Sequence, residues 1–538
     1  MGIETNAELI RALEEQIAEG NGAAIELKRT RNSLLNISTR VPPEILGNIF
    51  VWAAAQERDL PFSATCFEGL KRGSYSFVLV CHHWFKVASD TPELWTFWGN
   101  TLGDWNERYH HAGAAPVDLV LDGYATSGEV LSIPLRNELK DRAARDGIRQ
   151  IHIRGDDTDC LGPVLSALTP DEEGVRRNCI KSIILQTATI PEELSDFLAR
   201  SRLPQLQHLN IAGTLKSPFW DHVTSQTTHL VTLSLEFTRS SLPPTTSTSQ
   251  LISILASNPH LQHLTLWRAS LPGDTDGSGV RVPLRHLRTI SLAGEFRCVF
   301  RLMQRLELPD AMESTILTTD DATVEDIYQT LVPHMRDFFR RDTRFKDRLG
   351  VDASFSPGVR IFVNLDHPLE TILPRELPSP TAGFSASIID QPPDPVMKKL
   401  CLDLMALIPQ EHVATMTMGC TLDVPEELFF AMPNIEHLRI YGATLSDGFL
   451  LPNPNGPHAN AKLLPSLRSL RLEDVITTDW KSLKTYLAHQ TSDGQTISLQ
   501  VFNEFSYISP EDMKEIQDMV EKFTWCVYGL DWDDPYVE

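Results

Sequence analysis

One short spelling recurs along most of this chain: an apolar residue, two variable residues, an apolar residue, one variable residue and an apolar residue. Clear copies are LQHLNI at 206, LVTLSL at 230, LQHLTL at 261, LRTISL at 287, IEHLRI at 435 and LRSLRL at 467, and weaker copies are IRQIHI at 148, IKSIIL at 180 and VATMTM at 413. Starts at 148, 180, 206, 230, 261 and 287 are separated by 32, 26, 24, 31 and 26 residues. This spacing predicts a repeat array of short strands, each followed by a helical or looped return.

A single unit of this kind cannot bury its own apolar face. Stacked units do so, because they enclose a continuous column of Leu and Ile between a strand layer and a return layer. Prolines in LPQL, NPHL, MPNI and LPSL stand just before several of the strands, where they end the preceding return. The period is close to that of leucine-rich repeats. We therefore expect a leucine-rich-repeat-like α/β solenoid over residues 117–500.

The spelling lapses between residues 293 and 412. Candidate strands at 314–319, 359–365 and 384–389 still alternate there with helices expected at 323–342 and 395–408. We interpret this region as degenerate repeats with an insertion. The Pro- and Gly-rich spans 270–283, 374–383 and 450–460 are expected to be loops, and residues 501–538 a C-terminal cap with an acidic tail.

Composition excludes several classes of function. The chain has 538 residues, a formal net charge of −23 and 42% hydrophobic residues, so it exceeds one ordinary core and is not typical of a disordered protein. Sequence-independent binding to nucleic acid depends on clustered Lys and Arg, so we do not expect nucleic acid as a partner.

The eight cysteines form no CxxC pair, so neither a disulfide framework nor a zinc ribbon is indicated. The N-terminus lacks the pattern of a signal peptide or a myristoylation site, and no apolar run is long enough to cross a membrane. We expect a soluble protein of the cytoplasm, the nucleus or both, with no membrane partner.

Residues 1–36 predict an amphipathic helix, since Ile10, Leu13 and Ile17 share one helical face. The helix could be a coiled-coil dimerisation arm or a single helix leaning on its neighbour. Gly20 and Gly22 favour the second interpretation.

Residues 37–98 carry more large apolar residues than a small unit can bury. Pro42 and Pro43 suit the first turn of a helix, and the following apolar residues form a wide stripe. A second apolar cluster surrounds Trp84, and a third follows at Leu94. A unit of about 60 residues cannot cover all of this surface, so part of it should be an interface.

RVPPEILGNIF followed by LVCHHWFKVASDTPELW resembles the F-box, specifically the fungal F-box-like type in which an insertion separates the first helix from the VCxxW helix. In that family an N-terminal helix, an F-box and a leucine-rich-repeat-like body occur in this order, so the resemblance covers essentially the whole chain. It implies an N-terminal α-helical F-box module at 37–98, a linker at 99–116 and the solenoid beyond. The chain departs from the family pattern at Val41, where Leu is commoner.

The resemblance implies docking on the adaptor Skp1, which links F-box proteins to a cullin and thus to a ubiquitin-charged enzyme. The contacts that it implies are Pro42, Pro43, Ile45, Leu46, Ile49, Phe50, Val80, Cys81, Trp84, Val87, Leu94 and Trp95.

The repeat body would then face the protein substrate. In each predicted strand the variable residues between the apolar ones point away from the core. These candidate substrate-facing residues are His208, Asn210, Thr232, Ser234, His263, Thr265, Trp267, Ser291, His437, Arg439, Tyr441 and Arg471. For each of them, plain solvated surface is the alternative.

Metal and catalytic sites are not indicated. With one strand per repeat, His208 and His263 would lie roughly 10 Å apart, too far to share zinc. GDTDGSG at 273–279 resembles the start of a calcium loop, but Arg285 stands where a bidentate Glu is needed. No phosphate-binding glycine loop or hydrolase motif is present, so we expect neither cofactor nor catalytic residue.

Our leading hypothesis is a non-catalytic substrate-recognition subunit of a Skp1–cullin–F-box ubiquitin ligase. The alternative is a scaffold or interaction protein that does not engage a cullin.

Overall fold

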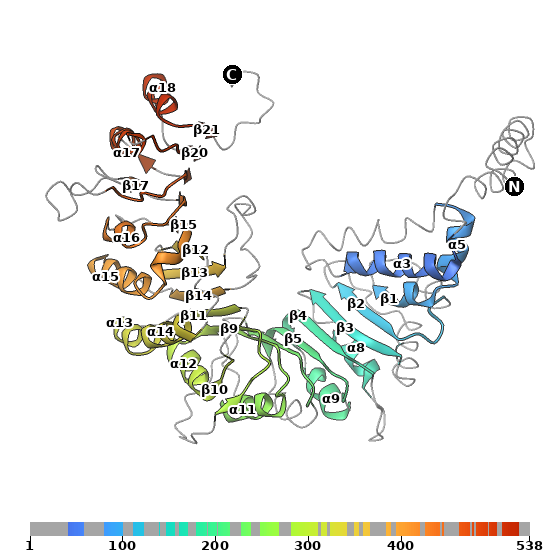
Figure 1. The fold of residues 1–538 in the computed structure, drawn as a ribbon. Coiled ribbons are helices and arrows are strands. Elements are labelled where there is room, and N and C mark those ends of the chain that lie inside the picture. The colour runs from blue at the N-terminus through green and yellow to red at the C-terminus, as the bar shows by residue number, and fades with distance from the viewer. Residues whose placement is uncertain are drawn as a thin grey trace, which may run out of the picture. The chain divides into compact units, whose positions relative to one another are not determined.

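The computed structural model describes residues 41–58, 80–99, 111–122, 139, 147–155, 161–169, 179–190, 192–201, 203–215, 227–237, 248–267, 281–309, 312, 314–319, 323–341, 349–354, 359–365, 383–388, 394–419, 426–441, 444–445, 462–473, 476–477, 480–492, 494–502 and 508–526. The chain forms two compact units, Met1–Leu230 and Val231–Glu538. Figure 1 shows the helices and strands of the chain. The helix expected at 1–36 and the calcium-like loop at 273–279 lie outside the described residues.

The first unit opens with short helices. They are α3 (Pro43–Arg58), α5 (His82–Ser89) and the 3-10 helix η3 (Pro92–Thr96). Pro43 begins α3, and the carbonyl of Pro42 accepts hydrogen bonds from the amides of Ile45 and Leu46 at 3.0 Å each. The predicted start of this helix is therefore confirmed.

A parallel sheet follows in the same unit. Strand β1 (Phe97–Gly99) pairs with β2 (Val117–Asp122), which pairs with β3 (Ile148–Gly155), then β4 (Ser182–Ile190) and β5 (His208–Leu215). Helix α8 (Leu161–Leu168) connects β3 with β4, and α9 (Glu193–Arg200) connects β4 with β5. The parallel ladder thus begins at Phe97, before the strand region expected from residue 117.

A bulge interrupts the pairing of β4 with β5. The register shifts between Gln186 and Thr189, and Gly213 lies opposite with a φ of 143°. A Cβ on Gly213 would come within 2.0 Å of the Thr187 carbonyl oxygen. Glycine is required here both for the backbone conformation and for the close approach.

The second unit starts with parallel strands in chain order. They are β6 (Thr232–Phe237), β7 (His263–Trp267), β9 (Thr289–Gly294) and β11 (Ser314–Thr319). The connections contain α11 (Thr248–Ser257), α12 (Phe296–Arg305) and a small ribbon of β8 (Val282–Pro283) with β10 (Leu306–Glu307). After β11 come α13 (Val324–Asp326), the π-helical turn η5 (Ile327–Leu331) and α14 (Val332–Arg341).

The order of strands reverses where the repeat spelling lapses. Next to β11 lies β14 (Gly383–Ile388), in parallel, and β13 (Val359–Leu365) and β12 (Leu349–Ser354) follow it in antiparallel pairing. Beyond β12 the ladder becomes parallel again with β15 (Val413–Gly419), which follows α15 (Asp394–Met405) and η8 (Gln410–His412). The strands expected at 314–319, 359–365 and 384–389 are confirmed, but the reversal and β12 were not predicted, because an antiparallel insertion lacks the repeat spelling.

The last part of the unit is parallel throughout. Strand β15 pairs with β16 (His437–Tyr441), followed by β18 (Ser469–Glu473), β20 (Ser498–Phe502) and β21 (Lys522–Cys526). The connections contain α16 (Glu426–Ala431), α17 (Lys481–Thr491), α18 (Pro510–Met519) and the ribbon of β17 (Thr444–Leu445) with β19 (Ile476–Thr477). The ladder therefore continues to Cys526, into the segment expected to be a cap.

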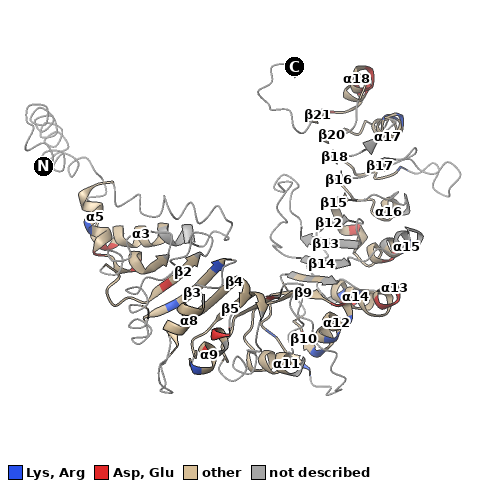
Figure 2. Cartoon of the chain, turned by 180° about the vertical axis from the view of Figure 1, so that it is seen from behind, with Lys and Arg blue, Asp and Glu red and all other residues tan. Residues whose placement is uncertain are grey.

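Helices α14 to α18 lie on one side of the second unit's strands in both views (Figures 1 and 2). The apolar positions of the repeat spelling form the core: Leu264, Leu292, Leu438 and Leu470 are at most 1% exposed, and Leu266 is 2% exposed. The fold is mixed α/β with a large, mainly parallel sheet, as the repeat spelling predicts at this coarser level.

Candidate functional site

Helix α3 carries large apolar side chains on two faces. Leu46 and Phe50 point into the first unit and are 3% and 2% exposed. Ile45, Ile49 and Trp52 follow one another at helical spacings of four and three residues, and they are 51%, 49% and 64% exposed. The second face is therefore open to solvent.

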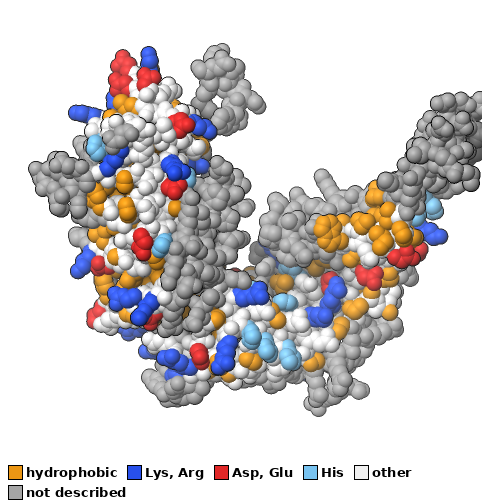
Figure 3. All heavy atoms as spheres, in the orientation of Figure 1, with side chains coloured by type: hydrophobic (Ala, Val, Ile, Leu, Met, Phe, Trp, Pro, Cys, Tyr) orange, Lys and Arg blue, Asp and Glu red, His pale blue; other side chains and the backbone are white. Residues whose placement is uncertain are grey.

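Two further apolar side chains are exposed beside the start of α5. Val80 is 52% exposed and Phe85 is 47% exposed. Figure 3 shows hydrophobic side chains gathered over α3 and α5. We call Ile45, Ile49, Trp52, Val80 and Phe85 the docking patch.

The docking patch rests on a well-packed base. The rings of Phe50 and Trp84 lie 5.0 Å apart between centroids and join α3 to α5. The indole of Trp95 donates a hydrogen bond of 2.8 Å to the Ala88 carbonyl, so η3 is tied to α5. A Cβ on Gly47 would come within 2.8 Å of the Thr91 hydroxyl, so glycine permits the close approach of α3 to this segment.

The structure divides the residues that the F-box resemblance implies as contacts. Exposed are Pro42, Pro43, Ile45, Ile49 and Val80; partly buried are Cys81 and Trp84; buried are Leu46, Phe50, Val87, Leu94 and Trp95. The side chains of the buried five fill the core beneath the patch, and the expectation that they contact an adaptor stays a prediction. Their role is to hold the exposed residues in place.

Two members of the patch were missed by the sequence-based list. Trp52 lies seven residues after Ile45 and Phe85 follows Trp84 directly. The helical period from Ile45 through Ile49 to Trp52 was the signal that could have identified Trp52.

The candidate substrate-facing residues lie in cross-strand rows. On β6, β7 and β9 one row contains Thr232, His263 and Thr289, and the next contains Ser234, Thr265 and Ser291. Trp267 on β7 is 46% exposed, and its indole donates a 2.9 Å hydrogen bond to the Ser291 hydroxyl. This tryptophan is thus both accessible and held in one orientation.

Glu236 occupies the position beside Trp267 in the register of β6 and β7. Burial raises the pKa of its carboxyl, while a hydrogen bond from Ser234 opposes that shift. A partly buried acid therefore lies next to the exposed indole.

A second set of rows runs across β16, β18 and β20. Arg439 pairs in register with Arg471, and Arg471 with Gln500; Tyr441 pairs with Glu473, and Glu473 with Phe502. Glu473 forms ion pairs with both arginines. The side chains of Arg439 and Glu473 are 10% and 5% exposed, and that of Arg471 is 22% exposed.

Aromatic rings flank this cluster. The guanidinium carbon of Arg471 lies 4.4 Å from the centroid of the Phe502 ring, and that of Arg439 lies 6.0 Å from the Tyr441 ring. A Cβ on Gly419 would come within 2.3 Å of the Tyr441 ring, so the absence of a side chain there lets the ring lie over β15. We call Arg439, Arg471, Glu473, Tyr441 and Phe502 the arginine cluster.

Two of the predicted substrate-facing residues are buried rather than exposed. Ser234 is 7% exposed and Arg439 is 8% exposed. For Arg439 the physical reason is its ion pair with Glu473. Among the others, Trp267 is exposed, and those that are partly buried are His208, Asn210, Thr232, His263, Thr265, Ser291, His437, Tyr441 and Arg471.

Sequence reasoning missed Glu473 and Phe502. Glu473 continues the alternation of LRSLRL by one residue, and Phe502 ends the alternating stretch SLQVF. Both could have been found by extending the period of two through each strand.

The three histidines that share a repeat position lie on separate strands, β5, β7 and β16. Within the described residues there is no group of three or more His, Cys, Asp or Glu side chains that could hold a metal ion. In the same part of the chain, no helix combines the length and apolarity needed to cross a membrane.

In comparisons with known proteins, no protein-family model matches the chain, and no curated protein matches it.

Proposed function

We propose that residues 37–98 dock on a Skp1-like adaptor in the manner of an F-box, while the strand-and-helix body, a leucine-rich-repeat-like solenoid, binds a protein substrate. The chain would act as the substrate-recognition subunit of a Skp1–cullin–F-box ubiquitin ligase and perform no chemistry itself. Its contribution is proximity, since a held substrate presents its lysines at high effective concentration to the ubiquitin-charged enzyme.

The observation that supports this proposal is the exposed docking patch. Five large apolar side chains between 47% and 64% exposed lie on two neighbouring segments. Burying a side chain of this size contributes roughly 1.5–3 kcal/mol, and tryptophan is enriched among the residues that dominate protein interfaces. A partner that covers the patch would gain this energy without unfolding the core beneath it.

Binding of a purified Skp1-like adaptor to the full chain tests the proposal. Ile49→Asp and Trp52→Ala are expected to weaken binding by on the order of tenfold or more. Both should leave the melting temperature nearly unchanged, because both side chains are exposed. Trp267→Ala is the matched control, since it removes an exposed tryptophan of the second unit.

Failure of the wild-type chain to bind the adaptor would contradict the proposal. So would equal binding by wild type, Ile49→Asp and Trp52→Ala. If the adaptor binds but a cullin never joins it, the scaffold alternative is favoured. Leu46 is unsuitable for this test, because it is buried and its replacement would disturb the fold.

A further inference from the structure

The arginine cluster carries more positive charge than its own residues neutralise. Within the described part of the chain, two guanidinium groups share the carboxylate of Glu473, which leaves the cluster a formal charge of +1 in a chain whose net charge is −23. Like charges directly opposite each other on neighbouring strands destabilise a sheet. Arg439 and Arg471 are such a pair, so the arrangement calls for a second anion.

The hydrogen bonds of the cluster also indicate a missing acceptor. Each guanidinium has five N–H donors. Arg439 is 8% exposed, yet its buried Nε atom has no hydrogen-bond partner among the residues that the structure describes. An unmet donor on a buried, charged group is costly, and it indicates that the cluster is organised for one more acceptor.

The size and charge of the missing group can be inferred from the cluster. One singly charged carboxylate would bring the formal charge to zero, whereas a phosphate carries about −1.5 to −2 and would also repel Glu473. The Phe502 ring, 4.4 Å from the Arg471 guanidinium carbon, and the Tyr441 ring offer apolar contact beside the charge. Arg471 is the more exposed arginine, with 22% of its side chain accessible, so the ligand would approach from its side.

We propose that the arginine cluster binds one carboxylate of a partner protein, with an apolar neighbour of that carboxylate against the Phe502 ring. The carboxylate comes from an Asp or Glu side chain or from a chain terminus, and both sources present the same planar acceptor to an arginine fork. That the partner is the ligase substrate rests on the proposed function. The anion site itself does not.

Ligand-observed saturation-transfer NMR with the full chain tests this site. The probe is hippurate, which carries a carboxylate near a phenyl ring, and the neutral control is hippuramide. Wild-type protein is expected to transfer saturation to hippurate and not to hippuramide. Arg471→Gln should weaken hippurate binding by on the order of tenfold. Arg468→Gln is the matched control, because it removes the same charge from the same segment at a side chain that is 73% exposed.

Two more variants make the test specific. Arg439→Lys keeps the charge but lacks the planar fork, so it should also bind hippurate more weakly. Glu473→Gln raises the formal charge to +2 and should shift preference from hippurate to phenyl phosphate. Circular dichroism melting curves check that each variant is folded.

Absence of hippurate binding to the wild type, or equal binding by wild type, Arg471→Gln and Arg439→Lys, would overturn the proposal. Tighter binding of phenyl phosphate than of hippurate to the wild type would overturn the assignment of a carboxylate. Two classes of peptide distinguish the sources. In acetylated and amidated peptides the carboxylate is that of an internal Glu, and in the other class it is the free C-terminus. Binding of either class supports the site. No adaptor is present, so failure here leaves the docking proposal unaffected.

Discussion

Burial in the core changes the pKa of an ionisable side chain on strand β3. His152 on β3 is 1% exposed. Burial, together with the positive charge of Arg154, lowers the pKa of its imidazole to about 4. The neutral imidazole is therefore a part of the first unit's core, and its protonation opposes folding.

The sign of the pH effect follows from this pKa. In the unfolded chain the imidazole titrates near 6.5, so between about pH 6.5 and pH 4 the unfolded state binds more protons than the folded state. The stability contributed by His152 is complete above that window and is lost as the pH falls through it. We expect a loss of roughly 2 kcal/mol between about pH 7 and pH 5 from this group.

Urea unfolding of the wild type and of His152→Leu at both pH values measures the effect. The wild type should lose more stability than the variant on going from pH 7 to pH 5, because leucine cannot be protonated. Parallel pH profiles for the two chains would contradict the prediction.

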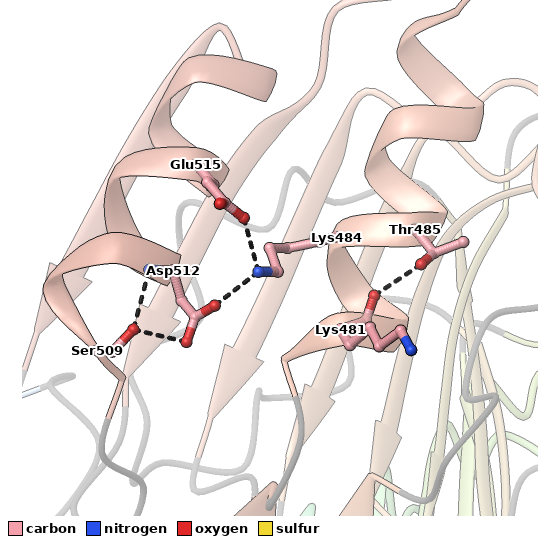
Figure 4. A network of polar contacts seen from close by, with 6 residues as sticks. All are labelled: Lys481, Lys484, Thr485, Ser509, Asp512 and Glu515. Carbon is pink, nitrogen blue, oxygen red and sulfur yellow. Dashed lines mark hydrogen bonds and ion pairs between the residues drawn. The ribbon is translucent and has the colours of Figure 1, made fainter.

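Polar contacts between neighbouring helices act at the scale of elements. The Nζ atom of Lys484 on α17 lies 2.6 Å from Asp512 and 2.7 Å from Glu515, both on α18 (Figure 4). Ser509 caps α18 by accepting a 3.0 Å hydrogen bond from the Asp512 amide. These contacts raise the pKa of Lys484 and lower the pKa of Asp512. Because the groups are accessible to solvent, salt should screen their attraction.

Lys484→Met is expected to lower the melting temperature slightly at low ionic strength. The difference from wild type should vanish in about 1 M NaCl, where the screening length is only about 3 Å. Melting curves at low and high salt measure this. Lys514→Met, which removes a lysine of α18 outside this network, serves as the control. A decrease of the same size at both salt concentrations would show that packing, not charge, joins the helices.

Some strands of this protein were predicted from the sequence and others were not. Strands with the repeat spelling, such as β7 and β16, were predicted within two residues of their observed starts, because the alternation of apolar and polar residues is a local property. Strands β1 and β12 were not predicted, because neither carries the repeat spelling. On the exposed face of α3, Ile45 and Ile49 were named from the sequence, whereas Trp52 was not.

The whole molecule consists of two compact units, Met1–Leu230 and Val231–Glu538. Within each unit, many strands pair with the next strand in the sequence, and each unit has its own internal contacts. A chain organised in this way is not expected to unfold in a single all-or-none step.

Differential scanning calorimetry tests this expectation. The calorimetric enthalpy of unfolding should exceed the van't Hoff enthalpy, because parts of the chain melt independently. His152→Leu, which changes only the first unit, should move one component of the transition and leave the other in place. One transition with equal enthalpies would show instead that both units unfold together.

The sequence by itself determined the positions of the strands with the repeat spelling, the mixed α/β class and the apolar surplus of residues 37–98, because each of these follows from residue spacing within a short segment. Tertiary structure decided which apolar side chains of α3 remain exposed, where the ladder turns antiparallel, and that Arg439, Arg471 and Glu473 meet. Those outcomes depend on which segments pair and in what register. Arg439 and Glu473 lie 34 residues apart in the sequence, so no pattern within one short segment specifies their contact.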